Sequence, residues 1–299
     1  MTRLFTTASA TVLALLGGAA MAEGINYLSY GAGYAHLEQD GAADKLDITT
    51  LSGSIEYETG PWVLSGALDY LAYKEGGGTD DATFVDATVG YAVTPGFYAM
   101  LGYSDILTSS SSDNGLWRLG GEYHTGAYRM GLGYSQANDG DFSATTAYVG
   151  YTLSEQTDFA GAVTVDDDGD TRLLLLADHD TGPWSFDGAA VHFFDRDATY
   201  YDLNAKYEFA GNYRALGGVS GYAQGGDSIT RVGLGAGYEL RDDMWIDLTA
   251  ARYVQSGSGP EINEIGLALT FETGGHKLLA NDLIDTERWI ASSVIGGAG

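Results

Sequence analysis

The feature that most constrains this chain is an alternation of apolar and polar residues with a period of two. In the segment GAYRMGLGYSQ (126–136), every second residue from Tyr128 to Tyr134 is aromatic or apolar. Arg129 and small or polar residues occupy the positions between them. A repeat of two residues is the period of a β-strand. Because tyrosine stands at both ends of the apolar face, the pattern suits a strand that crosses a bilayer and meets lipid headgroups at each side.

The same alternation continues through most of the chain, in segments separated by turn residues. We count sixteen segments, expected at about 25–38, 45–58, 61–74, 82–93, 97–107, 116–125, 127–136, 142–153, 157–166, 171–180, 184–195, 198–209, 212–223, 228–240, 244–254 and 261–272. Longer polar connections such as DDDGD (166–170) alternate with tight turns such as TGP (59–61). Long loops at one end and tight turns at the other are typical of outer-membrane barrels. We therefore predict an all-β fold, a transmembrane antiparallel up-and-down β-barrel of about 16 strands.

The N-terminus predicts export. Arg3 precedes an apolar run that ends in Ala20-Met21-Ala22, which is the order of a secretory signal peptide. The apolar run is shorter than the roughly 20 residues that a membrane-spanning helix needs. We expect three parts: a cleaved signal peptide (1–22), an outer-membrane β-barrel (23–274) and a C-terminal tail (275–299). Removing Arg3 with the signal leaves a net charge of 13 − 41 = −28.

Composition excludes several classes of function. The 299 residues include 41 acidic residues against 14 Lys and Arg, which argues against nucleic acid as a partner because phosphates attract basic proteins. The chain has no cysteine, so disulfides, thiol nucleophiles and cysteine metal ligands are excluded. The acidic loops lack the ligand spacing of a calcium loop, and no nucleophile, base and orienting group converge in the pattern. We expect no enzyme, no cofactor and no metal site.

Aromatic residues near the strand ends predict two belts at the membrane interfaces. The expected partners of these belts are outer-membrane lipid and lipopolysaccharide, because aromatic rings with a polar edge settle at headgroup level. The expected interfacial residues are Trp62, Tyr91, Phe97, Tyr103, Tyr123, Tyr128, Tyr134, Tyr151, Tyr207, Tyr238 and Phe271.

Several segments share a glycine–tyrosine signature: GAGYAH (31–36), ATVGYAV (87–93), MLGYSD (100–105), GLGYSQ (131–136), YVGYTL (148–153) and GLGAGYEL (233–240). They resemble the strands of Gram-negative porins, especially the general-diffusion porins of alphaproteobacteria, and the likeness covers nearly all of 25–272. The resemblance implies a sixteen-stranded barrel, often trimeric, through which ions and small hydrophilic solutes diffuse. Family members fold a long loop after the fifth strand into the pore. Here that loop is only about 108–115, so the pore is expected to be wider, or narrowed by side chains or by the tail.

The face of the strands opposite to lipid carries charges and is expected to line the pore. The expected pore-lining residues are Arg118, Arg129, Arg172, Lys206, Arg214, Arg231, Glu56, Asp69, Asp86, Glu122, Asp202, Glu208, Glu239, Asp247 and Glu264. Acids exceed bases, so the pore should prefer cations. Arg118 and Arg129 could form part of a basic row, or could pair locally with Glu122 or Glu239. Two segments, LLLLAD (173–178) and AAVHFF (189–194), are apolar on both faces, which predicts that part of the lumen is packed.

The tail after Phe271 is unusual, because family members usually end at the aromatic residue of the final strand. Leu278, Leu279, Ile284, Trp289 and Ile290 are spaced for a short amphipathic helix. Three placements are open: inside the lumen as a plug, on the membrane surface, or free. We therefore expect an outer-membrane porin for passive diffusion of ions and small hydrophilic solutes. The alternative is a non-conducting structural or surface-interaction barrel closed by its tail.

Overall fold

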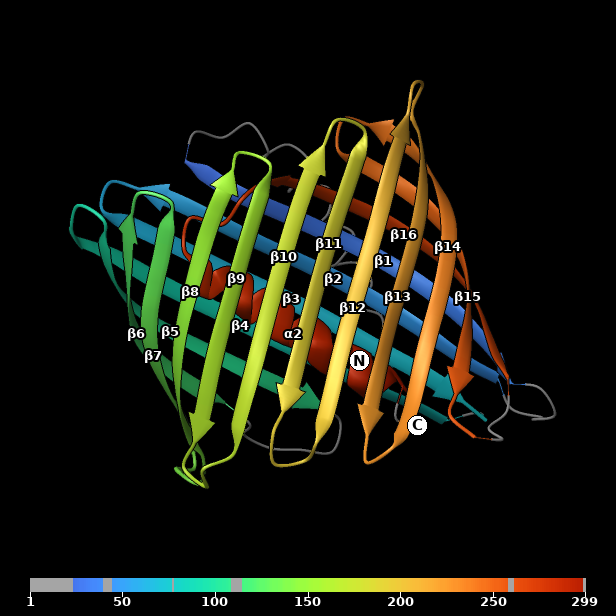
Figure 1. Ribbon diagram of the computed structural model, residues 1–299, viewed down its shortest axis with the longest axis horizontal. Helices are drawn as coiled ribbons and strands as arrows, with labels where there is room; N and C mark the ends of the chain where they lie inside the picture. Colours follow the sequence, from blue (N-terminus) through green and yellow to red (C-terminus); the bar gives the residue numbers. More distant parts are fainter. Residues whose placement is uncertain (1–23, 40–44, 77, 109–114, 258–260, 298–299) are drawn as a thin grey trace, which may run out of the picture.

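The chain forms a closed antiparallel barrel of sixteen strands, in which each strand pairs with its sequence neighbours and β1 closes on β16 (Figure 1). This computed structural model describes residues 24–39, 45–76, 78–108, 115–257 and 261–297, with side chains up to 288 in the last range. The strands are β1 (Ile25–Gln39), β2 (Lys45–Thr59), β3 (Trp62–Glu75), β4 (Gly78–Thr94), β5 (Phe97–Thr108), β6 (Leu116–Thr125), β7 (Tyr128–Ala137), β8 (Ser143–Ser154), β9 (Thr157–Asp166), β10 (Thr171–Thr181), β11 (Trp184–Phe193), β12 (Ala198–Phe209), β13 (Tyr213–Gln224), β14 (Asp227–Arg241), β15 (Met244–Gln255) and β16 (Ile262–Gly274).

The predicted fold class is confirmed, and the expected ranges agree with the observed strands to within a few residues. The largest difference is at β4, which begins at Gly78 rather than at 82. The predicted signal peptide lies outside the described residues, as does most of the loop after β5. Tight turns lie at one end of the barrel, and two of them place Asn212 and Asp243 in the left-handed backbone region. Asn and Asp tolerate this region better than most residues do.

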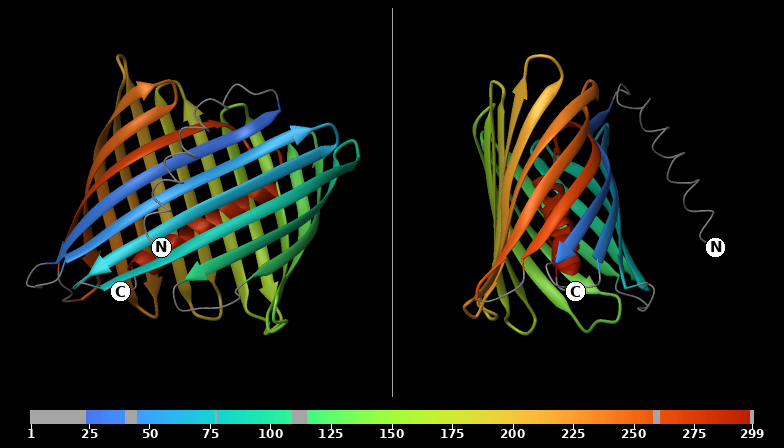
Figure 2. Two further views of the ribbon diagram at one scale, coloured as in Figure 1. Left: turned by 180° about the vertical axis from the view of Figure 1, so that it is seen from behind. Right: turned by 90° about the vertical axis from the view of Figure 1, so that its right-hand side faces the viewer.

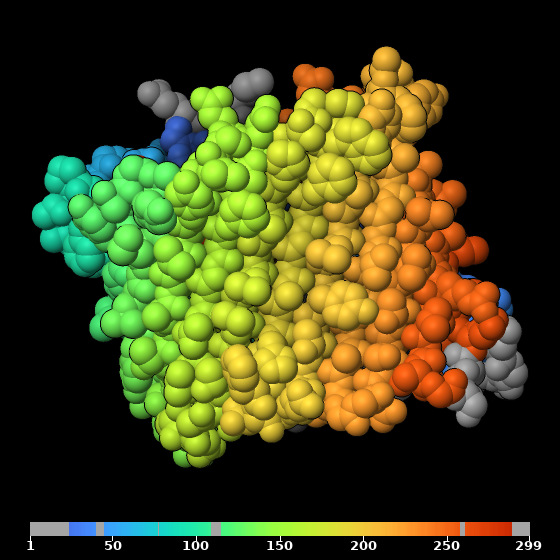
Figure 3. Space-filling view, viewed as in Figure 1, coloured from blue at the N-terminus to red at the C-terminus, as the bar shows by residue number. Residues whose placement is uncertain are grey.

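The outer face of the barrel is apolar, as the alternation predicts. Figure 3 shows one side of it as a continuous surface over neighbouring strands. Leucines on this face are largely exposed, and Leu234 reaches 72%. Rings at the tight-turn end meet across strands: the ring centroids of Trp62 and Tyr91 are 4.6 Å apart, and those of Tyr128 and Tyr151 are 4.8 Å apart. An apolar exterior of this kind is what lipid contact requires.

Most of the expected interfacial aromatics are exposed: Trp62, Tyr91, Phe97, Tyr123, Tyr128, Tyr134, Tyr151 and Tyr238. Tyr103 and Tyr207 are half-buried. Phe271 is buried instead, because its ring stacks on Tyr30 with centroids 4.8 Å apart and packs beside Leu28. Phe271 therefore belongs to a small apolar cluster across the β1–β16 seam.

The C-terminal helix α2 (Leu279–Gly297) lies inside the barrel (Figures 1 and 2). It begins near the tight-turn end, where the backbone N–H of Leu279 contacts Glu122 of β6. It then runs obliquely toward the loop end, where Glu287 pairs with Arg172 near the start of β10. The predicted helix is present but longer than expected, and it takes the lumen placement among the three. Among the described residues, no helix is long and apolar enough to cross a membrane.

Candidate functional site

An apolar cluster fills one half of the lumen and joins α2 to the wall. Leu278, Leu279 and Leu283 are buried, and Leu278 is 0% exposed. They share this cluster with inward side chains of β3, β5 and β8 to β12: Val63, Tyr98, Met100, Tyr148, Ala162, Leu174, Val191 and Tyr200. Leu176 and Phe193 pack against the same cluster. The segments that are apolar on both faces therefore face lipid on one side and α2 on the other, which confirms the predicted packed lumen.

Two glycines of the wall let α2 approach closely. A Cβ atom added at Gly90 would lie 2.8 Å from Cδ1 of Leu278, and one added at Gly150 would lie 2.8 Å from Cδ2 of Leu279. Carbon atoms in contact are normally 3.5 to 4.0 Å apart. A side chain at either position would require Leu278 or Leu279 to move, and a bulky one would crowd the start of the helix.

Glu122 of β6 binds the first turn of α2. Its carboxylate is 0% exposed and accepts hydrogen bonds from the backbone N–H groups of Leu279 (2.9 Å) and Ala280 (3.0 Å). Tyr148 donates to the same carboxylate at 3.1 Å, and His124 lies 2.6 Å from it. The first N–H groups of a helix have no partner within the helix and carry partial positive charge. A buried carboxylate at this point satisfies two of them and complements the helix dipole.

Glu56 of β2 binds the segment that leads into the helix. Its carboxylate is also 0% exposed and accepts hydrogen bonds from the backbone N–H of Lys277 (2.7 Å) and the side-chain amide of Asn281 (2.6 Å). Nδ1 of His276 lies 3.3 Å from it. A buried carboxylate is tolerated only when it is paired and hydrogen-bonded, and most of the partners of Glu56 come from the tail. The wall is therefore complementary to the tail.

His276 lies between the wall and the helix. Its Nε2 is 3.1 Å from Asp285 of α2, its ring centroid is 4.0 Å from that of Tyr27 of β1, and its carbonyl oxygen accepts from Arg129 of β7. Burial alone would lower the pKa of His276, but Asp285, Glu56 and the nearby Asp282 raise the pKa to about 9. The imidazole is therefore protonated at neutral pH and adds a charge-assisted link between β2 and α2.

Three further ion pairs hold α2 along its length. Arg129 of β7 reaches Asp282 at 3.4 Å, and Arg172 of β10 reaches Glu287 at 2.8 Å. Arg288 of the helix donates to Asp69 of β3 at 2.6 Å. Of the expected pore-lining residues, five therefore bind the tail: Glu56, Asp69, Glu122, Arg129 and Arg172.

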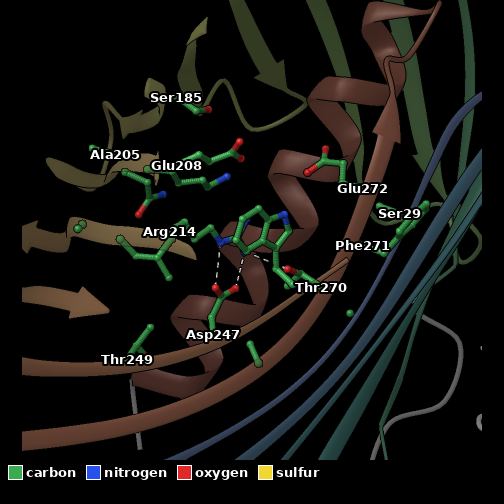
Figure 4. A pocket seen from close by; sticks show the side chains of 18 of the residues that line it. Ser29, Ser185, Ala205, Glu208, Arg214, Asp247, Thr249, Thr270, Phe271 and Glu272 are labelled. Carbon is green, nitrogen blue, oxygen red and sulfur yellow. Dashed lines mark hydrogen bonds and ion pairs between the residues drawn. The ribbon is translucent and has the colours of Figure 1, made fainter. Parts of the chain in front are cut away.

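The other half of the lumen holds a polar cavity of about 630 Å³, lined by residues of β10 to β16 together with β1 and β2. Figure 4 shows Arg214 and Asp247 pointing toward each other in it. Nε of Arg214 donates to Asp247 at 2.9 Å, and its guanidinium carbon lies 4.3 Å from the ring centroid of Trp245. Thr270 accepts a further hydrogen bond from Arg214 at 3.3 Å. The arginine is therefore held in a fixed position by three groups.

A second ion pair lies farther toward the loops. Arg231 binds Glu264 through two hydrogen bonds of 2.6 and 2.9 Å, and the hydroxyl of Tyr253 donates to the same carboxylate at 2.7 Å. A smaller cavity of about 360 Å³ lies beyond it, at the loop ends of β13 to β15. Arg231, Tyr253 and Glu264 thus lie on the same wall between the two cavities.

The remaining predicted pore-lining residues also have defined places. Arg118 pairs with Asp86, Lys206 lies 3.5 Å from Asp187, and Asp202 accepts from Asn204. Glu208 lines the larger cavity. Glu239 accepts a backbone hydrogen bond from Asp243 within a tight turn.

The possible basic row of Arg118 and Arg129 does not form. In the β6–β7 register Arg118 lies opposite Ser135, whereas Arg129 lies opposite His124, so the two side chains are six residues apart along the strands. For Arg118, the alternative of pairing within the wall is correct in kind, but its partner is Asp86. Arg129 instead pairs with Asp282 of the tail.

The residues that sequence reasoning missed lie at the start of the tail: His276 and Lys277 precede the helix, and Asn281 belongs to its first turn. The available signal was the pair of strands with apolar residues on both faces, since such residues in a lumen require a partner. Among the described residues, no group of three or more histidine and acidic side chains is arranged to hold a metal ion.

Comparison with known proteins identifies the fold. No protein-family model and no curated protein matches the sequence. Solved structures from Pseudomonas aeruginosa are similar. OpdQ aligns with a TM-score of 0.51 at 9% identity over 85% of this chain and 99% of that chain. OpdO aligns with a TM-score of 0.50 at 13% identity, covering 83% and 96%. OpdD aligns with a TM-score of 0.50 at 10% identity, covering 85% and 99%.

The fold is therefore that of the sixteen-stranded porins of the Gram-negative outer membrane, which agrees with the predicted location.

Proposed function

We propose that this protein is an outer-membrane channel for passive diffusion of ions and small hydrophilic solutes, with half of its lumen filled by its own tail. The observation that carries the proposal is the polar cavity beside α2. Arg214 and Arg231, which line it, are held against the wall in ion pairs, which leaves the space in front of them open. The resemblance of the glycine–tyrosine strands to alphaproteobacterial general-diffusion porins supports an unspecific range of small solutes.

The open half should favour cations. The larger cavity is lined by five acidic residues, Asp180, Glu208, Asp243, Asp247 and Glu272, and by three basic ones, Lys206, Arg214 and Arg231. The balance is 3 − 5 = −2, and low-dielectric walls strengthen the field of such an excess. Since Arg214 and Arg231 are already paired, an entering anion finds few free positive partners.

The test is the conductance of the refolded mature protein, from Glu23, in a planar bilayer with a salt gradient. Stable steps with a cation-selective reversal potential are the expected result. Anion-selective steps would still support a channel but would contradict the charge argument. A folded barrel without steps would overturn the channel itself.

The tight packing of Leu278, Leu279 and Leu283 favours a second candidate, a structural barrel closed by its tail. A variant that ends at Gly274 separates the two candidates. If the protein is a channel, it conducts with its tail in place, and the truncation only increases the size of each current step. A closed structural barrel conducts only after the truncation.

Two assembly partners complete the proposal, a homotrimer and lipopolysaccharide. In support of the trimer, Gly161, Gly188 and Gly217 lie opposite lipid-facing leucines in the register, which places small residues on the outer face. Chemical crosslinking of the protein in outer membranes tests the trimer. Co-purification of lipopolysaccharide in mild detergent tests the lipid partner.

A further inference from the structure

The direction of α2 through the lumen is defined by its contacts. At its start, Leu279 binds Glu122, which lies three residues from the tight-turn end of β6. At its ninth residue, Glu287 binds Arg172, which is the second residue of β10 and lies beside the loops. The helix therefore runs from the tight-turn end to the loop end, and the ribbon views agree (Figures 1 and 2).

The length of α2 brings its last turns close to the outer rim. Its 19 residues span about 28 Å at 1.5 Å per residue, and the apolar band of such a barrel is about 25 Å tall. Beyond Arg288, the helix continues to Gly297, about 14 Å along its own axis or roughly 10 Å of height at a tilt like that of the strands. From Asp69, the partner of Arg288, β3 continues six residues to Glu75, about 20 Å along the strand or roughly 15 Å of height after tilt.

We propose that the C-terminal end of α2 is presented at the loop-bearing mouth of the barrel and is accessible from outside the cell. An even number of strands returns the chain to the periplasmic side at Gly274. The tail then crosses the membrane once more, through the lumen rather than through lipid. The protein thus exposes on the cell surface a helix end that barrel topology alone would leave in the periplasm.

The contacts that fix α2 make this placement a stable one. Glu56 and Glu122 hold its first turn, and ion pairs to β3, β7 and β10 hold it farther along. These partners belong to separate strands around one half of the wall. The helix cannot reverse its direction without leaving both buried carboxylates without their tail partners.

The proposal rests on the proposed outer-membrane location and on the orientation that places the loops outside. The natural chain contains no cysteine, so single cysteines can be labelled without background. The experiment treats intact cells with a polymer-linked maleimide that is too large to enter the barrel. It compares Gly297→Cys with Asp168→Cys in the loop after β9 and Glu155→Cys in the tight turn after β8, both of which are exposed positions.

We expect Gly297→Cys and Asp168→Cys to react in intact cells and Glu155→Cys to react only after the cells are opened. Reaction of Asp168→Cys without Gly297→Cys would overturn the inference and leave the channel proposal intact. Reaction of Glu155→Cys alone would show that the tight turns face outward. That result would contradict both the inference and the orientation on which it rests. If Gly297→Cys fails to fold, a cysteine added after Gly299 gives the same readout. If this added cysteine does not react while Asp168→Cys does, the inference is again overturned.

Discussion

Replacing Glu122 by glutamine should release the start of α2 from the wall. In the wild type, the two carboxylate oxygens separately accept the N–H groups of Leu279 and Ala280. A glutamine keeps the shape of the side chain but places an NH₂ group where one oxygen stood. One helix N–H then faces another donor, and the negative charge at the helix N-terminus is lost.

The size of the effect follows from these contacts. A hydrogen bond to a charged group contributes about 1.5 to 3 kcal/mol, and a charge at a partly buried helix end contributes up to about 2 kcal/mol. Because the glutamine retains one acceptor, we expect the docking free energy of α2 to fall by about 2 to 4 kcal/mol. At about 1.4 kcal/mol for each factor of ten, the undocked population should rise at least about 30-fold.

Single-channel recording measures this population. A variant that ends at Gly274 defines the current of the barrel without its helix, and Glu122→Gln should visit that level at least about 30 times more often than the wild type. The matched control is Glu264→Gln, a buried carboxylate paired with Arg231 on the open side of the lumen. Equal visits by the wild type and Glu122→Gln, or equal increases in both variants, would refute the role of the carboxylate.

Three further predictions concern the same lumen. The pKa of His276 is raised from its usual 6.5 to about 9, so protonation of His276 stabilises the docked helix by about 3 kcal/mol. This stabilisation is fully present below about pH 6.5 and is lost as the pH rises through 9. Openings to the current level of the truncated barrel should therefore increase over this range, and His276→Gln should abolish the increase. Gly90→Val and Gly150→Val should each raise the frequency of large openings without altering the tail, whereas an unchanged frequency would contradict the close approach of the helix. Arg214→Gln leaves Asp247 without its ion pair, so the reversal potential should become more cation-selective and the melting temperature should fall; a shift toward anions would contradict the assigned charge balance.

The barrel was predictable because the two-residue alternation of each strand can be read within that strand's own sequence. The lipid-facing residues of each strand can be identified within the strand itself. Tyr128 and Leu132, for example, can be assigned to the lipid face without information about any distant residue. Arg214 and Arg231 could be assigned to the inward face for the same reason. Their partners could not be assigned, because Asp247 and Glu264 lie two strands away and the pairing depends on the register across the strand between.

The helix in the lumen was harder to predict, because amphipathicity alone does not determine which surface a helix meets. Leu278 and Leu279 suit a lipid surface as well as a protein one. Only the inward leucines of β10, such as Leu174, indicate that the lumen has an apolar wall to bury. The two carboxylates that bind the tail also resembled ordinary pore-lining acids, because Glu56 and Glu122 alternate with apolar residues as the other inward acids do.

The seam between β1 and β16 has a consequence for the order of assembly. It joins the first and last strands, so the barrel can close only when β16 is available to pair with β1. Until the tail docks, Glu56 lacks its partners His276, Lys277 and Asn281, and Glu122 lacks its two helix N–H donors. Closure of the wall and filling of its interior are thus separate steps of assembly, and α2 completes a core that the strands alone leave unfinished.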